Sequence, residues 1–159
     1  MIVEHIHYDR TGQTYDSSIF TAERDCADLA RAYRATKHIQ DYVFTDGTAE
    51  RSVERRFAEA LDKAAEVCVY AKLPRGFHIP TPVGNYSPDW AIAFHDGTVR
   101  HIFFIAETKG TMDSLNLRPI EQAKIACAKR LFNAISTSDV RYHDVDSYQT
   151  LLDIMHDLV

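Results

Sequence analysis

The sequence has few of the residues that would crosslink a small fold or hold a structural metal. Its 159 residues include only three cysteines, Cys26, Cys68 and Cys127. They are widely spaced and form no CxxC pair, so neither a disulfide framework nor a zinc ribbon is indicated. The chain is long enough to bury a hydrophobic core without such supports, and too short for two independent domains of ordinary size.

Long hydrophobic stretches are also missing. No apolar run approaches the roughly 20 residues that a membrane-spanning helix needs, and residues 1–5 lack the basic and then apolar pattern of a secretory signal. With 45% hydrophobic and 26% charged residues, the composition is that of a globular protein rather than a disordered one. We therefore expect a cytoplasmic protein with no membrane partner.

The sequence has no excess of positive charge. Lysine and arginine total 18 against 23 acidic residues, which gives a formal net charge of -5. Free-standing nucleic-acid binders usually carry a basic excess that attracts phosphates. Taken alone, this balance argues against a protein that binds DNA strongly without help.

Helical and strand patterns alternate along the chain. The first fifteen residues favour a strand or loose hairpin, and apolar residues at helical spacing predict a helix from Thr21 to about residue 38. A second amphipathic helix is predicted over 53–64. The later predicted elements are strands over 67–71, 89–94 and 100–107 with a turn at 95–97, a helix from Pro119, a strand over 140–143 and a helix capped by Ser147.

This order predicts an α/β fold in which helices flank a mixed β-sheet. Its core order from residue 50 is helix, strand, strand, strand, helix, strand, and a further helix follows. We expect one domain over residues 1–159, consisting of an N-terminal extension (1–49), a core (50–145) and a C-terminal helix (146–159).

Two carboxylates and a lysine are placed where they could perform chemistry. Asp89 follows Pro88 at the start of one predicted strand, while Glu107 and Lys109 flank Thr108 at the end of the next. Alternation along a strand puts Glu107 and Lys109 on one side. If the two strands pair as a hairpin, Asp89 and Glu107 meet at its open end, close enough to share a divalent cation.

Mg²⁺ prefers such hard oxygen ligands, so two acids and the Thr108 carbonyl would leave room for a phosphate and a water. Lys109 could then hold that water for in-line attack on phosphorus, without a covalent intermediate. The alternative from the pattern alone is that Asp89 and Glu107 are solvated strand-end acids and Lys109 is their pairing partner.

Longer motifs around these residues resemble a known family. The stretches LPRGFHIPTPVGNYSPDWAI (73–92) and FIAETKG (104–110), with ERRFAEALD (54–62) and AKIACAK (123–129), are similar to the C-terminal nuclease domain of the restriction (Res) subunit of type III restriction-modification enzymes. That family belongs to the PD-(D/E)xK nuclease superfamily and has a restriction-endonuclease-like core. The resemblance implies Mg²⁺-dependent cleavage of double-stranded DNA, with Mn²⁺ as a substitute. Asp89 and Glu107 would be metal ligands and Lys109 the catalytic lysine.

The resemblance also implies parts that are missing here. Full-length restriction subunits carry an ATP-driven, helicase-like motor, yet this chain has no GxxxxGK[ST] loop. In the family, a methyltransferase (modification) subunit recognises the DNA sequence. ATP and S-adenosylmethionine would therefore act only through parts absent from this chain. A second hypothesis is a catalytically inactive nuclease fold used for DNA contact or subunit docking.

Other residues have two interpretations each. Glu54 lies on the helix before the sheet, where it is either a third acid that binds a metal or orients a water, or a solvated surface acid. Lys72, Arg75 and Lys124 are candidates for contact with DNA phosphates. The alternative for Lys72 and Arg75 is that they belong to a rigid structural loop, and the alternative for Lys124 is that it is a solvated surface lysine. Trp90 alternates to the face opposite Asp89, which favours a core position over base stacking.

Overall fold

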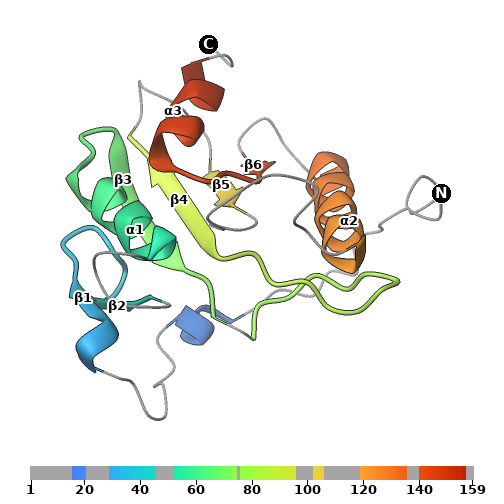
Figure 1. Ribbon diagram of the computed structural model, residues 1–159, viewed down its shortest axis with the longest axis horizontal. Coiled ribbons are helices and arrows are strands. Elements are labelled where there is room, and N and C mark those ends of the chain that lie inside the picture. The colour runs from blue at the N-terminus through green and yellow to red at the C-terminus, as the bar shows by residue number, and fades with distance from the viewer. Residues whose placement is uncertain are drawn as a thin grey trace.

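A four-stranded mixed sheet lies at the centre of the computed structural model (Figure 1). The structure describes residues 16–20, 29–45, 52–74, 76–95, 102–105, 119–135 and 140–156. The sheet strands, in spatial order, are β3 (Val67–Lys72), β4 (Trp90–Phe94), β5 (Ile102–Ile105) and β6 (Val140–His143). The first two pairings are antiparallel and the third is parallel. The parallel pair needs a crossover, which contains helix α2 (Pro119–Ile135). The predicted α/β class with a mixed sheet is confirmed.

Among the described residues, three α-helices accompany the sheet, and α1 (Val53–Lys63) shows why they form where predicted. The hydroxyl of Ser52 accepts a hydrogen bond from the Arg55 N–H at 3.2 Å, which caps the first turn. Phe57 and Leu61, four residues apart, turn their side chains into the core. The final helix is α3 (Tyr148–His156). No helix in the described part of the chain is long and apolar enough to cross a membrane.

The larger part of the core lies between α1, α3 and the first two strands of the sheet (Figure 1). Its centre is Trp90, which is completely buried. The Trp90 ring lies 5.7 Å from that of Phe57 and 6.1 Å from that of Tyr70, measured between centroids. Leu151 of α3 closes the cluster. The predicted core position of Trp90 is confirmed.

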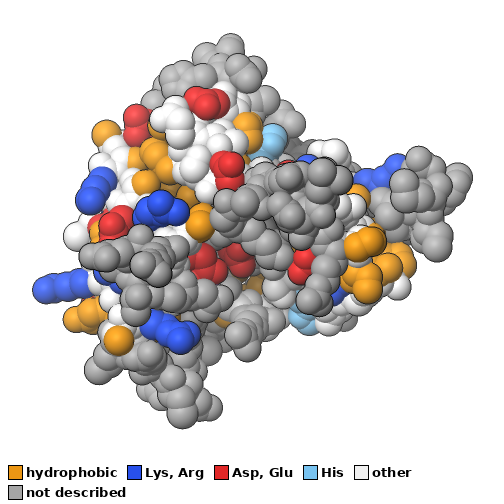
Figure 2. Space-filling view, in the orientation of Figure 1, with side chains coloured by type: hydrophobic (Ala, Val, Ile, Leu, Met, Phe, Trp, Pro, Cys, Tyr) orange, Lys and Arg blue, Asp and Glu red, His pale blue; other side chains and the backbone are white. Residues whose placement is uncertain are grey.

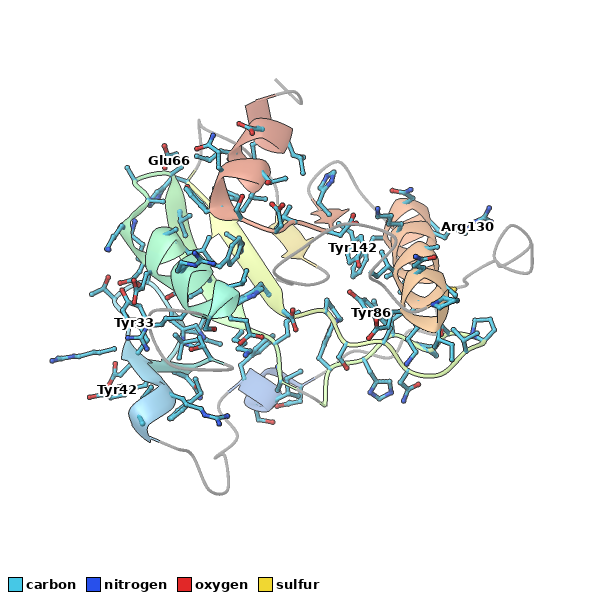
Figure 3. The ribbon with its side chains drawn as sticks, in the orientation of Figure 1. Tyr33, Tyr42, Glu66, Tyr86, Arg130 and Tyr142 are labelled. Atoms are coloured by element: carbon cyan, nitrogen blue, oxygen red, sulfur yellow. The ribbon has the colours of Figure 1, made fainter. Side chains whose placement is uncertain are left out.

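A second cluster fastens the connection between β3 and β4 to helix α2 and to β6, the strand at the opposite edge of the sheet. Within this connection, Ile79 and Tyr86 form an isolated antiparallel bridge. The Tyr86 and Tyr142 hydroxyls are hydrogen-bonded at 2.9 Å (Figure 3), and Phe132 of α2 stacks on Tyr142. The chain segment that leads to Asp89 is therefore held by both α2 and β6.

The helix predicted from Thr21 to about residue 38 is wrong at its C-terminal end. After the short 3-10 helices η2 (Ser17–Phe20) and η3 (Leu29–Arg31), the chain forms strand β1 (Ala32–Arg34), which pairs with β2 (Tyr42–Phe44) in a two-stranded antiparallel ribbon. Residues 21–28, like the strand or hairpin expected before residue 16, lie outside the described residues. Long-range contacts override local helical spacing here.

Two contacts explain why this ribbon forms. The Asp62 carboxylate of α1 accepts hydrogen bonds from the Thr36 and Lys37 N–H groups, both at 2.8 Å. The segment between β1 and β2 also runs parallel to β3, where the Ile39 N–H donates to the Tyr70 carbonyl at 3.0 Å. Neither contact can be read from helical periodicity, because its partners lie 25 or more residues apart.

We expect Asp62→Asn to destabilise the fold by about 1–2 kcal/mol at neutral pH, because hydrogen bonds to a charged acceptor are lost. Burial raises the pKa of Asp62, but hydrogen bonds from Lys37, Thr36 and Tyr33 outweigh it and hold this pKa below its ordinary value of 3.8. A carboxyl with a depressed folded-state pKa stabilises the fold above its unfolded pKa, and that contribution is lost as pH falls through the folded pKa.

Urea denaturation between pH 7 and about pH 3 measures this effect, with Asp153→Asn as a control for an exposed helical aspartate. The difference between wild type and Asp62→Asn should shrink below pH 3.8. A difference that stays constant over this range would contradict a stabilising charge at Asp62.

Candidate functional site

One end of the sheet brings together the end of β3 and the start of β4. Lys72, the last residue of β3, pairs with Trp90, the first residue of β4. The Leu73 N–H donates a hydrogen bond to the Asp89 carbonyl at 2.7 Å, so the backbone of Asp89 is attached directly to the chain leaving β3. The Asp89 side chain is partly exposed. Asp89 therefore stands at the open end of the sheet, as predicted.

The described part of β5 ends at the same place. Ile105 pairs with Trp90 in the antiparallel register, and Glu107 follows Ile105 by two residues in the sequence. Glu107, Thr108 and Lys109 themselves lie outside the described residues. The pairing of β4 with β5 that the prediction required is confirmed, and the convergence of the Asp89 and Glu107 carboxylates stays a prediction.

Helix α1 brings another acid to this end of the sheet. Glu54, in the first turn of α1, has a side chain that is 13% exposed, and its Oε2 lies 2.5 Å from Nζ of Lys72. A partly buried, ion-paired carboxylate is not a solvated surface acid, so that interpretation of Glu54 is wrong. Its predicted role as a metal ligand is not tested by this geometry.

The lysines predicted to contact DNA make other contacts in this structure. Lys72 binds Glu54 and also has its ammonium 5.8 Å from the centroid of the Trp90 ring. Lys124 of α2 donates to the Asn85 carbonyl at 2.9 Å and so helps hold the connection between β3 and β4. Arg75 lies outside the described residues. Contact of these three residues with DNA stays a prediction.

His38 also belongs to this site, although nothing in the sequence indicated it. Its Nε2 accepts a hydrogen bond from the Lys72 N–H at 3.0 Å, and its Nδ1 lies 3.1 Å from both the backbone nitrogen and the carbonyl oxygen of Gln40. The His38 ring also meets the Tyr70 ring edge to face, at 5.2 Å between centroids. No sequence signal could have found this role, because His38 lies in the connection between β1 and β2, 34 residues before Lys72 of β3.

The side chains at this site offer the hard oxygen donors that Mg²⁺ prefers. Figure 2 shows acidic side chains exposed in the middle of one face, among residues that are not described. In the described ranges, Asp89 and Glu54 are the expected ligands, and no three His, Cys, Asp or Glu side chains gather into a metal-binding group. Two other expected ligands, Glu107 and Thr108, fall outside those ranges. The carboxylates of Asp89 and Glu54 fit the ion.

Comparison with protein families identifies the class to which this fold and site belong. The model of a family described as an endonuclease domain matches residues 36–148, which is most of the chain. The chain therefore belongs to the endonuclease-domain family.

Two curated relatives narrow this assignment. The Res subunits of the type III restriction-modification enzymes EcoPI, from Escherichia phage P1, and EcoP15I, from Escherichia coli, are each 34% identical to the chain over 103 residues. The matches cover 63% of this chain and 10% of each relative, so the chain corresponds to about a tenth of their length. The predicted resemblance to a type III Res endonuclease domain is confirmed. No solved structure matches the chain significantly.

Proposed function

We propose that this chain is the Mg²⁺-dependent endodeoxyribonuclease domain of a type III restriction enzyme and hydrolyses phosphodiester bonds in double-stranded DNA. The observation that carries the proposal is the register at the end of the sheet. Ile105 of β5 lies opposite the residue that follows Asp89, two positions before Glu107. Together with membership of the endonuclease-domain family, this register supports a site of the PD-(D/E)xK type.

In this proposal, each polar group has one role. Asp89, Glu107 and the Thr108 carbonyl would hold Mg²⁺ or Mn²⁺, with Glu54 beside them. The bound ion would neutralise charge that develops on the phosphate oxygens. Lys109 would position the attacking water and stabilise the charged transition state by hydrogen bonding. The buried Trp90 and the attached β3 fix the backbone from which Asp89 projects.

The short match to each relative supports the further proposal that the domain works as part of a larger assembly. Its partners would be a helicase-like motor in the same full-length subunit and a modification subunit, in the cytoplasm. A net charge of -5 gives the domain little unaided affinity for DNA. A motor that holds DNA would raise the effective concentration of DNA at the site. We therefore expect the isolated chain to cleave slowly and without sequence specificity.

Nicking of a supercoiled plasmid tests the proposed activity with the chain alone. We expect nicking at high protein concentration with MgCl₂ or MnCl₂ and none with EDTA. Glu107→Gln and Lys109→Ala should each lower the rate at least about a hundredfold, since each removes a group required in the transition state. Asp153→Asn, on the exposed face of α3, is the matched control and should nick like wild type.

Nicking by Glu107→Gln at the wild-type rate would contradict the assignment of the site. If wild type neither nicks DNA nor binds Mn²⁺ in a calorimetric titration, the inactive docking module becomes the better description of the domain.

A further inference from the structure

The Glu54–Lys72 ion pair is set into the protein rather than lying on its surface. Both side chains are 13% exposed, and Nζ lies 2.5 Å from Oε2. Removing two charges from water is costly, and such a pair persists only when its geometry is good and further contacts support it. The surface pair Lys129–Asp144 is equally short, but its side chains are 47% and 24% exposed. The two pairs therefore differ in burial rather than in length.

Lys72 is fixed at both ends. At its backbone, the N–H donates to His38 and the strand pairs with β4. At its tip, the ammonium contacts Glu54 and lies within cation–π range of the buried Trp90 ring. Lys72 would have to leave these contacts to reach a DNA phosphate. Its position favours a role inside the site over direct contact with DNA.

The pair adjoins the start of β4. The residue after Lys72 is hydrogen-bonded to the Asp89 carbonyl, and Glu54 reaches the same strand end from α1. An ammonium here reduces the negative potential of nearby carboxylates, and a divalent cation arriving at the same carboxylates is repelled by it. The charge of Lys72 therefore weakens cation binding, in addition to the effect of its packing on the position of Glu54.

We propose that Lys72 is a positioning residue. It holds the Glu54 carboxylate in place, and its ammonium competes with the divalent cation for the negative charge of that carboxylate. This inference rests on the proposed function, because it assumes a cation at the Asp89 end of the sheet. The inference predicts that removal of the Lys72 ammonium has opposite effects on cation affinity and on the rate of the chemical step. Without the ammonium, the cation should bind more tightly, while the chemical step should slow because Glu54 is no longer held.

Calorimetric titration of the full chain with MnCl₂ tests the first prediction. We expect Lys72→Met to lower the apparent Kd for Mn²⁺ by about three- to tenfold, in line with removal of one nearby positive charge. The nicking rate at saturating Mn²⁺ should fall about tenfold or more, because misplaced catalytic groups slow the reaction strongly. Lys129→Met, which breaks the exposed ion pair, should change neither quantity.

If Lys72→Met does not fold, the comparison of Glu54→Gln with the double variant Glu54→Gln/Lys72→Met replaces it, because the double variant leaves no unpaired buried charge. The double variant should bind Mn²⁺ more tightly than Glu54→Gln. Equal affinities in this comparison, or Mn²⁺ affinity in Lys72→Met that is unchanged or weaker, would overturn the inference.

The outcomes separate this inference from the proposed function. Mn²⁺ binding that Asp89→Asn abolishes but Lys72→Met does not tighten would overturn only the role of Lys72. Absence of Mn²⁺ binding by wild type would overturn both.

Discussion

Asp89→Asn is expected to reduce DNA nicking by about a thousandfold, the largest effect on activity that we predict. Asparagine keeps the size of the side chain but removes the negative charge that the proposed metal site requires. Losing one such electrostatic group costs about 10²–10³ in rate in other enzymes, and weaker metal binding adds to that loss. Plasmid nicking and Mn²⁺ titration on the same preparations measure the two contributions.

The fold should not depend on this charge, because the Asp89 side chain is partly exposed and its carbonyl, which binds the Leu73 N–H, is unchanged by the substitution. Equal urea midpoints for wild type and Asp89→Asn would confirm that only the site is altered. Full nicking activity in the folded variant would remove Asp89 from the mechanism.

Trp90→Ala is expected to have the largest effect on stability, about 3–5 kcal/mol in the free energy of unfolding. The indole is completely buried and packs against Phe57 of α1 and Tyr70 of β3. Its removal leaves a cavity between two layers of the fold, which the surrounding side chains cannot fill. Urea denaturation monitored by far-UV circular dichroism measures the loss.

Ile120→Ala is the matched control for Trp90→Ala, because Ile120 is 59% exposed at the start of α2. It should change stability by no more than about 0.5 kcal/mol. A loss below 1 kcal/mol for Trp90→Ala would mean that the core can repack around position 90, contrary to its central place in the cluster.

Local patterns predicted the elements of the central sheet well. The period change after α1, the Pro119 start of α2 and the Ser147 start of α3 each follow from side chains within one or two turns. Prediction failed over 32–34, where apolar spacing suggested helix. Hydrogen bonds from that region to Asp62 and to β3 decide the local structure, and such contacts leave no periodic trace.

The candidate site was predictable to a similar degree. Asp89 could be located because a strand start after proline is a local signal, and the register with β5 follows from the hairpin. The contacts of Glu54 and Lys72 with each other, and of His38 with Lys72, could not be predicted from residue types. They depend on how α1 and the β1–β2 ribbon pack against β3, which sequence spacing does not encode.

The parallel contact of the ribbon segment with β3 also affects how the chain behaves toward its own copies. β3 lies at one edge of the four-stranded sheet, and an open edge is a template for pairing with another chain. The bridge between His38 and Tyr70 covers part of that edge. Because the same segment supports Lys72, a substitution that detaches it would both disturb the site and expose a sheet edge. We therefore expect such a substitution to lower the proposed activity and to promote aggregation at the same time.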